Sequence, residues 1–256
     1  MILAMDIGNT RVKCAVVDGA RVMGREALPT ARCDNVTTLA DMVRRVATAV
    51  LSIERSVVSS VVPPVTIKAL RVIEDQTGTR ARLVDYKTLL PFRVDVEAPA
   101  RVGADRLCAA AGALGTRRRN AVIIDAGSAI TVDVVRDGVF LGGVIAAGPA
   151  LALRALGDHA SQLPAIDFTS LDSPFPKRID DTHNAMTLGA GLGGVGVIRE
   201  SVRYVEANAG VSLPKYITGG AAPVLLARLP RSWSHDPDLT LKGLDVIDQL
   251  YLPGSP

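Results

Sequence analysis

The sequence lacks the marks of a secreted, disulfide-stabilised or membrane-spanning protein. Its only cysteines are Cys14, Cys33 and Cys108, an odd number at wide spacing that suits a reducing compartment and shows no metal-ligand pattern. The first residues have no basic segment ahead of an apolar run, and no apolar run approaches the length that crosses a bilayer. We therefore expect a soluble, cytoplasmic protein with no membrane partner.

Aromatic residues and net charge are also low. Phe, Trp and Tyr make up 4% of the 256 residues, and the net charge of +3 is spread along the chain. A nucleic-acid-binding protein would concentrate basic residues on one face. The one dense cluster, residues 117–119, lies between a helical pattern and a strand and is interpreted as a solvated connection. We expect no nucleic-acid partner, and the 48% of hydrophobic residues fits an α/β enzyme.

The order of apolar patterns predicts two similar halves. In the first half, strands are expected at residues 2–7, 11–17, 22–28, 57–62 and 82–84, with one helix capped by Asn35 and another after residues 63–64. In the second half, strands are expected at 121–124, 129–135, 139–146 and 215–218, with helices near 150–156, 182–208, 223–229 and 241–251. Residues 170–181 are predicted to form a loop. The repeated order predicts an internal duplication.

Each half has a carboxylate and a glycine turn between its first two strands. Asp6 precedes Gly8 in the first half, and Asp125 precedes residues 127–128, a glycine and a serine, in the second. Such a turn offers free N–H groups and a carboxylate, which suit phosphate and a cation. One such turn alone is more often a plain hairpin. Two of them at matching positions favour phosphate binding, with the carboxylates interacting with metal ions because carboxylate and phosphate repel.

Two similar halves that each carry a phosphate-binding hairpin describe a known architecture. We expect an α/β fold of duplicated actin/hexokinase-like domains, of the ribonuclease H-like type found in sugar kinases, facing a nucleotide cleft. The expected domains are residues 1–117 and 118–256. Phosphoryl transfer needs positioning and charge neutralisation, which opposed hairpins can supply to ATP and Mg²⁺.

A third motif, residues 103–106, lies between the two hairpins. Gly103 can break the chain before a helix that begins near Asp105, and a helix N-terminus favours an ionised carboxylate. An ionised Asp can accept a proton from an alcohol as phosphate arrives. Arg106 can bind a carboxylate or phosphate through two hydrogen bonds. A plain helix-start residue with a surface arginine is the alternative, but the position between two phosphate hairpins favours catalysis.

Taken in order, these motifs resemble those of the type III pantothenate kinases. Residues 6–10 are similar to the family's first phosphate motif, residues 103–106 to its GxDR motif, and residues 125–131 to DxGTAxT with one change. Further similar segments are residues 142–148 (GGxIxPG), 162–164 (LP), 181–186 (NTxxAM), 217–220 (TGG) and 239–244 (LxLKGL). Each motif is short, but their order and spacing across nearly the whole chain are specific.

The resemblance implies a reaction and a set of site residues. ATP would phosphorylate pantothenate to 4′-phosphopantothenate, the first step of coenzyme A synthesis, with Asp105 as the proton acceptor. Pantothenate would contact Gly103, Ala104, Asp105 and Arg106. ATP would be bound by Asp6, Ile7, Gly8, Asn9, Thr10, Arg11, Val12, Lys13 and Ser128.

The resemblance also implies ions and a partner subunit. Mg²⁺ would accompany ATP, and Asp125 would bind a monovalent cation, K⁺ or NH₄⁺. The protein would be a homodimer with shared active sites, in which Thr182 reaches the substrate of the other subunit.

Three positions depart from the family pattern. Ser128 replaces the usual Thr and keeps its hydroxyl, Asp181 replaces Asn before Thr182, and Val96 stands where many members have a substrate-contacting Tyr. The last two favour an alternative, a related kinase for another small alcohol. A second alternative is a non-catalytic accessory factor for gene expression, for which a basic face or a helix-turn-helix would be expected.

Overall fold

The computed structural model describes residues 1–168 and 173–253. The chain forms two compact units. Unit 1 contains Met1–Asn120, Val135–Gly142 and the C-terminal segment that begins at Asp238, and unit 2 contains Ala121–Val134 and Gly143–Pro237. In the described part of the chain, no helix has both the length and the apolar character needed to cross a membrane.

Unit 1 is built on a sheet with the strand order β3-β2-β1-β4-β5. Its strands are β1 (Ile2–Ile7), β2 (Arg11–Asp18), β3 (Arg21–Pro29), β4 (Arg55–Ser60) and β5 (Arg82–Leu83). The central strand β1 is buried along its whole length, is antiparallel to β2 and is parallel to β4. The strands predicted in this half are confirmed to within two residues at most ends.

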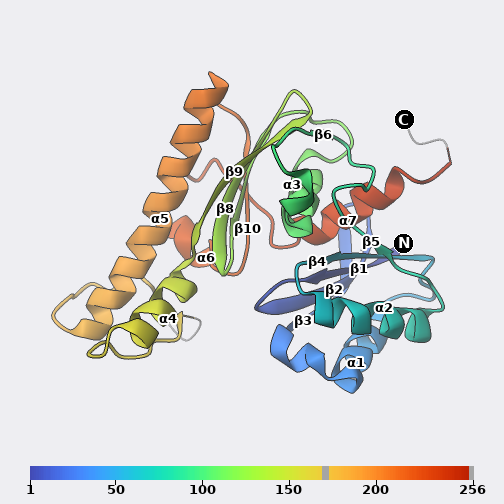
Figure 1. Cartoon of the computed structure of the whole chain (residues 1–256), viewed down its shortest axis with the longest axis horizontal. Helices are drawn as coiled ribbons and strands as arrows, with labels where there is room; N and C mark the ends of the chain where they lie inside the picture. The colour runs from blue at the N-terminus through green and yellow to red at the C-terminus, as the bar shows by residue number, and fades with distance from the viewer. Residues whose placement is uncertain (169–172, 254–256) are drawn as a thin grey trace. The chain divides into compact units, whose positions relative to one another are not determined.

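Two helices cover one face of this sheet (Figure 1). α1 (Val36–Ala47) begins after Asn35, whose side chain accepts a hydrogen bond from the Thr38 N–H, as the capping pattern predicts. α2 (Pro63–Thr77) begins with two prolines and ends at Gly78, which adopts a left-handed φ of 69°. Their apolar residues share one core with β1, β2 and β4.

A second helix pair in unit 1 is formed by α3 (Ala104–Leu114) and α7 (Leu239–Gln249). The two helices approach so closely that only glycine fits at the contact. A Cβ added at Gly243 would lie 1.8 Å from the Cys108 carbonyl oxygen, and one added at Gly112 would lie 2.1 Å from the Leu239 carbonyl oxygen. The position of α3, which carries Asp105, therefore depends on α7.

Three short elements of unit 1 were not predicted from the sequence. They are η1 (Thr30–Asp34), η2 (Pro99–Arg101) and the two-residue strand β6 (Arg93–Val94). β6 pairs with the first residues of β9 (Val139–Ala147), within the part of β9 that belongs to unit 1.

Unit 2 contains most of a second sheet, in the order β11-β10-β7-β8-β9. Besides β9, its strands are β7 (Ala121–Ala126), β8 (Ala129–Arg136), β10 (Lys215–Thr218) and β11 (Ser234–His235). β10 runs parallel to β7 and pairs Thr218 with Asp125. All the strands predicted in this half are confirmed, and among the described residues only the two-residue β11 was missed.

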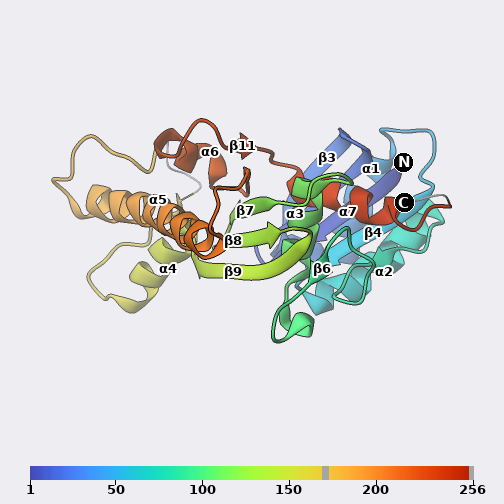
Figure 2. The same cartoon turned by 90° about the horizontal axis from the view of Figure 1, so that it is seen from above.

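The α-helices described in unit 2 are α4, α5 and α6 (Figure 2). α4 (Pro149–His159) and α5 (Thr182–Ala209) follow β9, and α5 packs Val195, Ile198 and Val202 into the core with β7 and β8. The helix predicted near 223–229 is shorter than expected, a single turn of α6 (Ala222–Leu225) followed by η4 (Leu226–Arg228). Of the predicted loop 170–181, residues 170–172 lie outside the described residues, and 173–181 contain no helix or strand.

Candidate active site

The turn between β1 and β2 in unit 1 is braced by hydrogen bonds. The Gly8 N–H donates to the Arg11 carbonyl over 3.0 Å, and the Thr30 hydroxyl donates to the Gly8 carbonyl over 2.7 Å. The Thr30 N–H also donates to the Thr10 carbonyl over 3.0 Å. The start of η1 thus holds the turn from outside, which leaves the tip of the turn in a defined conformation that can receive a ligand.

Burial divides the eight residues that were expected to bind ATP around this turn. Ile7 and Val12 are completely buried and anchor the two strands, and Asp6 at the end of β1 is 8% exposed. The residues that a ligand can reach are the exposed Asn9, Thr10 and Arg11 and the half-buried Gly8 and Lys13. The turn therefore presents its tip to solvent and keeps its carboxylate close to the core.

The motif at residues 103–106 forms the start of α3. Gly103 is the N-cap, and the Asp105 carboxylate accepts a hydrogen bond from the Arg106 N–H over 2.8 Å. A Cβ added at Gly103 would lie 2.3 Å from Asp105 Oδ1, so glycine leaves the space that this carboxylate occupies. The hydrogen bond holds the Asp105 carboxylate at the N-terminus of α3. The Arg106 guanidinium lies 5.8 Å from the centre of the Phe140 ring.

A buried thiol connects two of the predicted site residues. Cys108 lies one turn after Asp105 on α3 and is completely buried. Burial raises the pKa of this thiol well above its usual range, the negative charge of Asp6 raises it next, and that of Asp105 adds to it, while the nearby Ser59 hydroxyl acts in the opposite direction. Both carboxylates therefore act on one buried thiol, which stays protonated.

The turn between β7 and β8 in unit 2 is also closed by a glycine N–H, over a span one residue shorter than in unit 1. The Gly127 N–H donates to the Ala129 carbonyl over 3.0 Å, and the Gly148 N–H donates to the Ser128 carbonyl over 2.9 Å. A Cβ added at Gly148 would lie 2.2 Å from the Gly127 carbonyl oxygen, so the backbone after β9 packs directly against this turn. Ser128 is half-buried, and its position in a braced turn suits contact with a phosphate group.

Two glycines lie against the half-buried Asp125 at the end of β7. A Cβ added at Gly127 would lie 3.3 Å from Asp125 Oδ1, and one added at Gly219 would lie 2.4 Å from the same oxygen. Gly219 also has a φ of 97°, a conformation that disfavours any other residue. The backbone after β10 therefore approaches this carboxylate closely, as a small oxygen-lined ion site requires.

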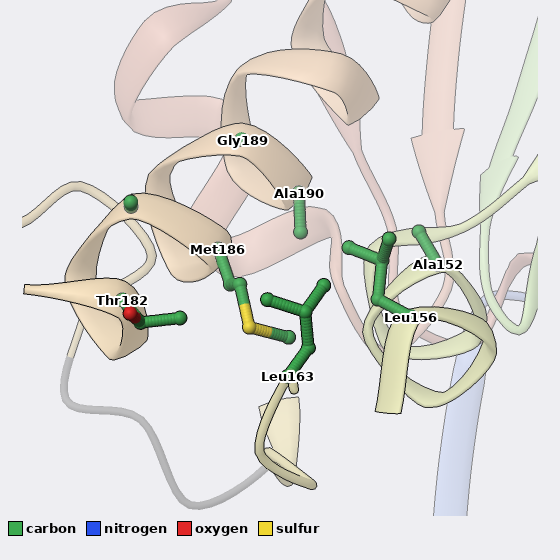
Figure 3. Close-up of a pocket in the computed structure, with 8 residues that line it drawn as sticks. Ala152, Leu156, Leu163, Thr182, Met186, Gly189 and Ala190 are labelled. Carbon is green, nitrogen blue, oxygen red and sulfur yellow. The ribbon is translucent and has the colours of Figure 1, made fainter. Parts of the chain in front are cut away.

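Thr182 is the first residue of α5 and is exposed. The Asp181 carboxylate before it caps the helix by accepting a hydrogen bond from the Asn184 N–H over 2.7 Å. Asp and Asn are equally good N-caps, which accounts for Asp181 in place of the family's usual Asn. Thr182 borders a cavity of about 430 Å³ whose other lining residues are mainly apolar (Figure 3) and come from α4, α5 and Leu163.

The predicted site residues thus fall into three local groups. In unit 1, residues 6–13 and 103–106 share the neighbourhood of Cys108 through Asp6 and Asp105. In unit 2, Asp125 and Ser128 share one turn, whereas Thr182 begins a separate helix. Cys108 and Ser59 were not predicted as site residues, although the spacing of three residues between Asp105 and Cys108 on a helix predicts that they share a face.

Comparison with solved structures defines the class of protein. The chain is similar to a conserved Baf family protein from Campylobacter jejuni, with 19% identity over 96% of each chain and a TM-score of 0.61. It is also similar to a ROK family glucokinase from Streptomyces griseus in complex with glucose and AMPPNP, with 13% identity over 97% of this chain and 99% of the other and a TM-score of 0.51. At these identities the likeness establishes the fold, which is α/β of the duplicated actin/hexokinase-like type.

Sequence comparison then identifies the family. The model of the type III pantothenate kinase family matches residues 2–204. The type III pantothenate kinase of Acidiphilium cryptum is 33% identical over 96% of this chain and 94% of its own length, and that of Thermus thermophilus is 33% identical over 95% and 97%. The chain belongs to the type III pantothenate kinase family.

Proposed function

We propose that this protein transfers the γ-phosphoryl group of ATP to the primary hydroxyl of pantothenate, which forms 4′-phosphopantothenate in the first step of coenzyme A synthesis. Membership of the kinase family supports the reaction class and the substrate. The observation that carries the mechanism is the start of α3, where the Asp105 carboxylate accepts a hydrogen bond from the Arg106 N–H over 2.8 Å. Three buried free cysteines fit the reducing conditions of the cytoplasm, where we propose the enzyme acts.

Asp105 would act as the proton acceptor for the substrate hydroxyl. As a carboxylate it would accept the proton late, when the hydroxyl oxygen is already bonding to phosphorus. Arg106 beside it would bind the pantothenate carboxylate or a hydroxyl, and residues 103–104 would contact the substrate with their backbone.

ATP would be bound by the braced turns at the start of each proposed domain, 1–117 and 118–256. Residues 6–13 would contact its phosphates through the N–H groups and side chains at the tip of the turn, and the Ser128 hydroxyl would donate to a phosphate oxygen. Bound Mg²⁺ neutralises the phosphate charge in such reactions. It is typically held by one or two carboxylates together with substrate phosphates and water, which fits the single, mostly buried Asp6 carboxylate.

Asp125 would bind a monovalent cation, K⁺ or NH₄⁺. The fit rests on its half-buried carboxylate and on the close approach of the Gly219 backbone. We predict that activity is low in Na⁺ buffer and rises with K⁺ or NH₄⁺, because such a cation would neutralise charge next to the phosphates. Steady-state rates in matched chloride salts measure the effect. Asp125→Ala should remove the response, and equal rates of the unaltered enzyme in all salts would contradict the site.

We further propose a homodimer in which Thr182 of each chain completes the site of the other. α5 has exposed glycines, including Gly193 and Gly196, at which an added Cβ would meet nothing within 4 Å of its own chain. Each such glycine costs a helix about 1 kcal/mol relative to alanine. Packing of the bare backbone against a partner would offset this cost, and in a twofold dimer it would occur twice.

Mixing two inactive variants tests the shared site. Asp105→Asn and Thr182→Arg are each expected to be inactive alone, and after subunit exchange the heterodimer should have one site with both residues intact. Roughly a quarter of the unaltered activity is expected in the mixture, because half of the molecules are heterodimers with one of two sites working. Native mass spectrometry verifies the exchange. A mixture that stays inactive despite verified exchange would show that each site is built from one chain.

A coupled ADP-release assay with purified protein tests the proposed reaction. The rate should depend on pantothenate, and a panel of other small alcohols, including pantetheine and hexoses, should give rates lower by up to about 10⁴-fold, the discrimination of a site built to hydrogen-bond its substrate. Pantothenate-independent hydrolysis alone, or faster turnover of another alcohol, would overturn the substrate assignment.

A further inference from the structure

Thr218 in unit 2 has a buried hydroxyl for which the described residues offer no partner. The residue is 1% exposed, and its Oγ1 makes no hydrogen bond within the described part of the chain. Buried hydroxyl groups are nearly always hydrogen-bonded, because leaving one unpaired is destabilising. An unpaired hydroxyl in a regular strand indicates that a bound ligand or ion pairs with it in the working protein.

The register of the sheet places this hydroxyl beside Asp125. β10 and β7 are parallel neighbours in which Thr218 and Asp125 are paired directly. Paired residues of adjacent strands point to the same face of a sheet. The next residue, Gly219, brings its backbone so close that an added Cβ would lie 2.4 Å from Asp125 Oδ1. Two oxygen-bearing side chains and a close backbone segment therefore converge at one end of β7.

The other half of the molecule contains a similar pair with one difference. In unit 1, Asp6 at the end of β1 is paired in register with Ser59 of the parallel strand β4, and Ser59 is completely buried. The Ser59 Oγ, like the Thr218 Oγ1, makes no hydrogen bond within the described part of the chain, but it is near enough to the Cys108 thiol to lower the pKa of that thiol. The pair in unit 2 differs because the backbone of Gly219 closes on its carboxylate, where an added Cβ would lie 2.4 Å from Asp125 Oδ1.

We infer that the Thr218 hydroxyl is a second protein ligand of the monovalent cation at Asp125, an assignment that rests on the proposed cation site. A hydroxyl oxygen can coordinate K⁺ and can accept a hydrogen bond from NH₄⁺, so it serves either ion. A neutral ligand next to one carboxylate also suits a singly charged ion, because the site then carries no excess negative charge that would favour a divalent ion. The cation in turn satisfies the buried oxygen.

The test uses thermal unfolding of the full-length chain in KCl, NH₄Cl and NaCl at equal concentration, without substrates. The unaltered protein should melt at a higher temperature in K⁺ or NH₄⁺ than in Na⁺. Thr218→Val keeps the shape and removes the hydroxyl. It should lose most of the K⁺ increment while melting in Na⁺ at or above the temperature of the unaltered protein, because a buried unpaired hydroxyl has been removed. Thr218→Ser should keep the increment.

Direct binding and matched controls complete the experiment. Titration with Tl⁺, a K⁺ substitute visible by NMR, should give an affinity weakened about tenfold or more in Thr218→Val, the lower end of the effect of losing a supporting group at a metal site. Ser59→Ala removes the matching hydroxyl of unit 1 and should leave the K⁺ increment unchanged. Thr218→Ala, which adds no atom, replaces Thr218→Val if that variant does not fold.

The results distinguish the role of Thr218 as a ligand from the existence of the cation site at Asp125. If Asp125→Ala loses the increment and Thr218→Val keeps it together with normal Tl⁺ affinity, Thr218 is not a ligand although the cation site stands. If the unaltered protein shows neither a K⁺ increment nor Tl⁺ binding, the cation site and the Thr218 assignment both fail. If Ser59→Ala loses the increment as Thr218→Val does, the effect reflects general loosening of the sheets and the assignment is also wrong.

Discussion

Replacing Asp105 by Asn is expected to lower turnover by about 10²-fold or more, the scale of general-base catalysis. Asn retains an oxygen that can accept the Arg106 N–H, which donates over 2.8 Å to the native carboxylate. The start of α3 should therefore keep its conformation. What is lost is the negative charge and the ability to take a proton from the substrate hydroxyl. The decrease should appear mainly in kcat, with the affinity for ATP nearly unchanged.

A carboxylate of the same unit outside the site provides the control. Asp95 is exposed and forms an ion pair with Arg93 over 3.0 Å. Exposed pairs of this kind contribute at most about 1 kcal/mol, so Asp95→Asn should have nearly normal turnover. Purified Asp105→Asn that is folded, binds ATP and turns over at a nearly normal rate would remove Asp105 from the chemistry.

The second large effect is expected at Gly243, where α7 meets α3. Gly243→Ala would place a Cβ 1.8 Å from the Cys108 carbonyl oxygen. Because this oxygen belongs to the backbone, no side-chain rotation can relieve the clash. Overpacking typically costs 1–3 kcal/mol, and we expect about 3 kcal/mol here. That loss corresponds to a melting temperature lower by roughly 6–12 °C. Differential scanning calorimetry measures it.

The matched control is Val246→Ala on the same helix. Val246 is only half-buried, and its truncation adds no atom toward α3, so a loss of about 1 kcal/mol or less is expected. Because α3 carries Asp105, Gly243→Ala should also lower kcat below the melting transition, whereas Val246→Ala should not. Equal melting temperatures for Gly243→Ala and the unaltered protein would show that the helices separate at little cost.

Much of the fold could be predicted because its elements have strong local patterns. The continuous apolar run of β1 and the alternation in β2 are the patterns of a buried strand and its neighbour, and Asn35 marks the start of α1. β6 and β11 have two residues each, too few for any period to be visible. The close contact of α7 with α3 could not be predicted, since the glycines responsible lie on helices more than 100 residues apart in the chain.

Some residues of the candidate site could also be predicted from the sequence, and others could not. Asp6, Asp105 and Asp125 could be named because each ends an apolar run or begins a helix next to a glycine, and the family motifs contain them. Ser59 could not be named, because its importance depends on parallel pairing with a strand about 50 residues away. Thr218 belongs to the segment 217–220 that resembles the TGG motif, but its pairing with Asp125, about 90 residues away, could not be predicted. The neighbours of a hydroxyl in a strand are unknown until the register of the sheet is known.

The most direct measurement follows the product itself. Purified protein is incubated with ATP, Mg²⁺, K⁺ and pantothenate, and the products are analysed by ³¹P NMR and mass spectrometry, with Asp105→Asn as the blank. The account predicts one new phosphomonoester with the mass of 4′-phosphopantothenate, formed in equal amount to ADP and nearly absent in the blank. ADP accompanied only by inorganic phosphate, or phosphopantothenate formed equally fast by Asp105→Asn, would contradict it.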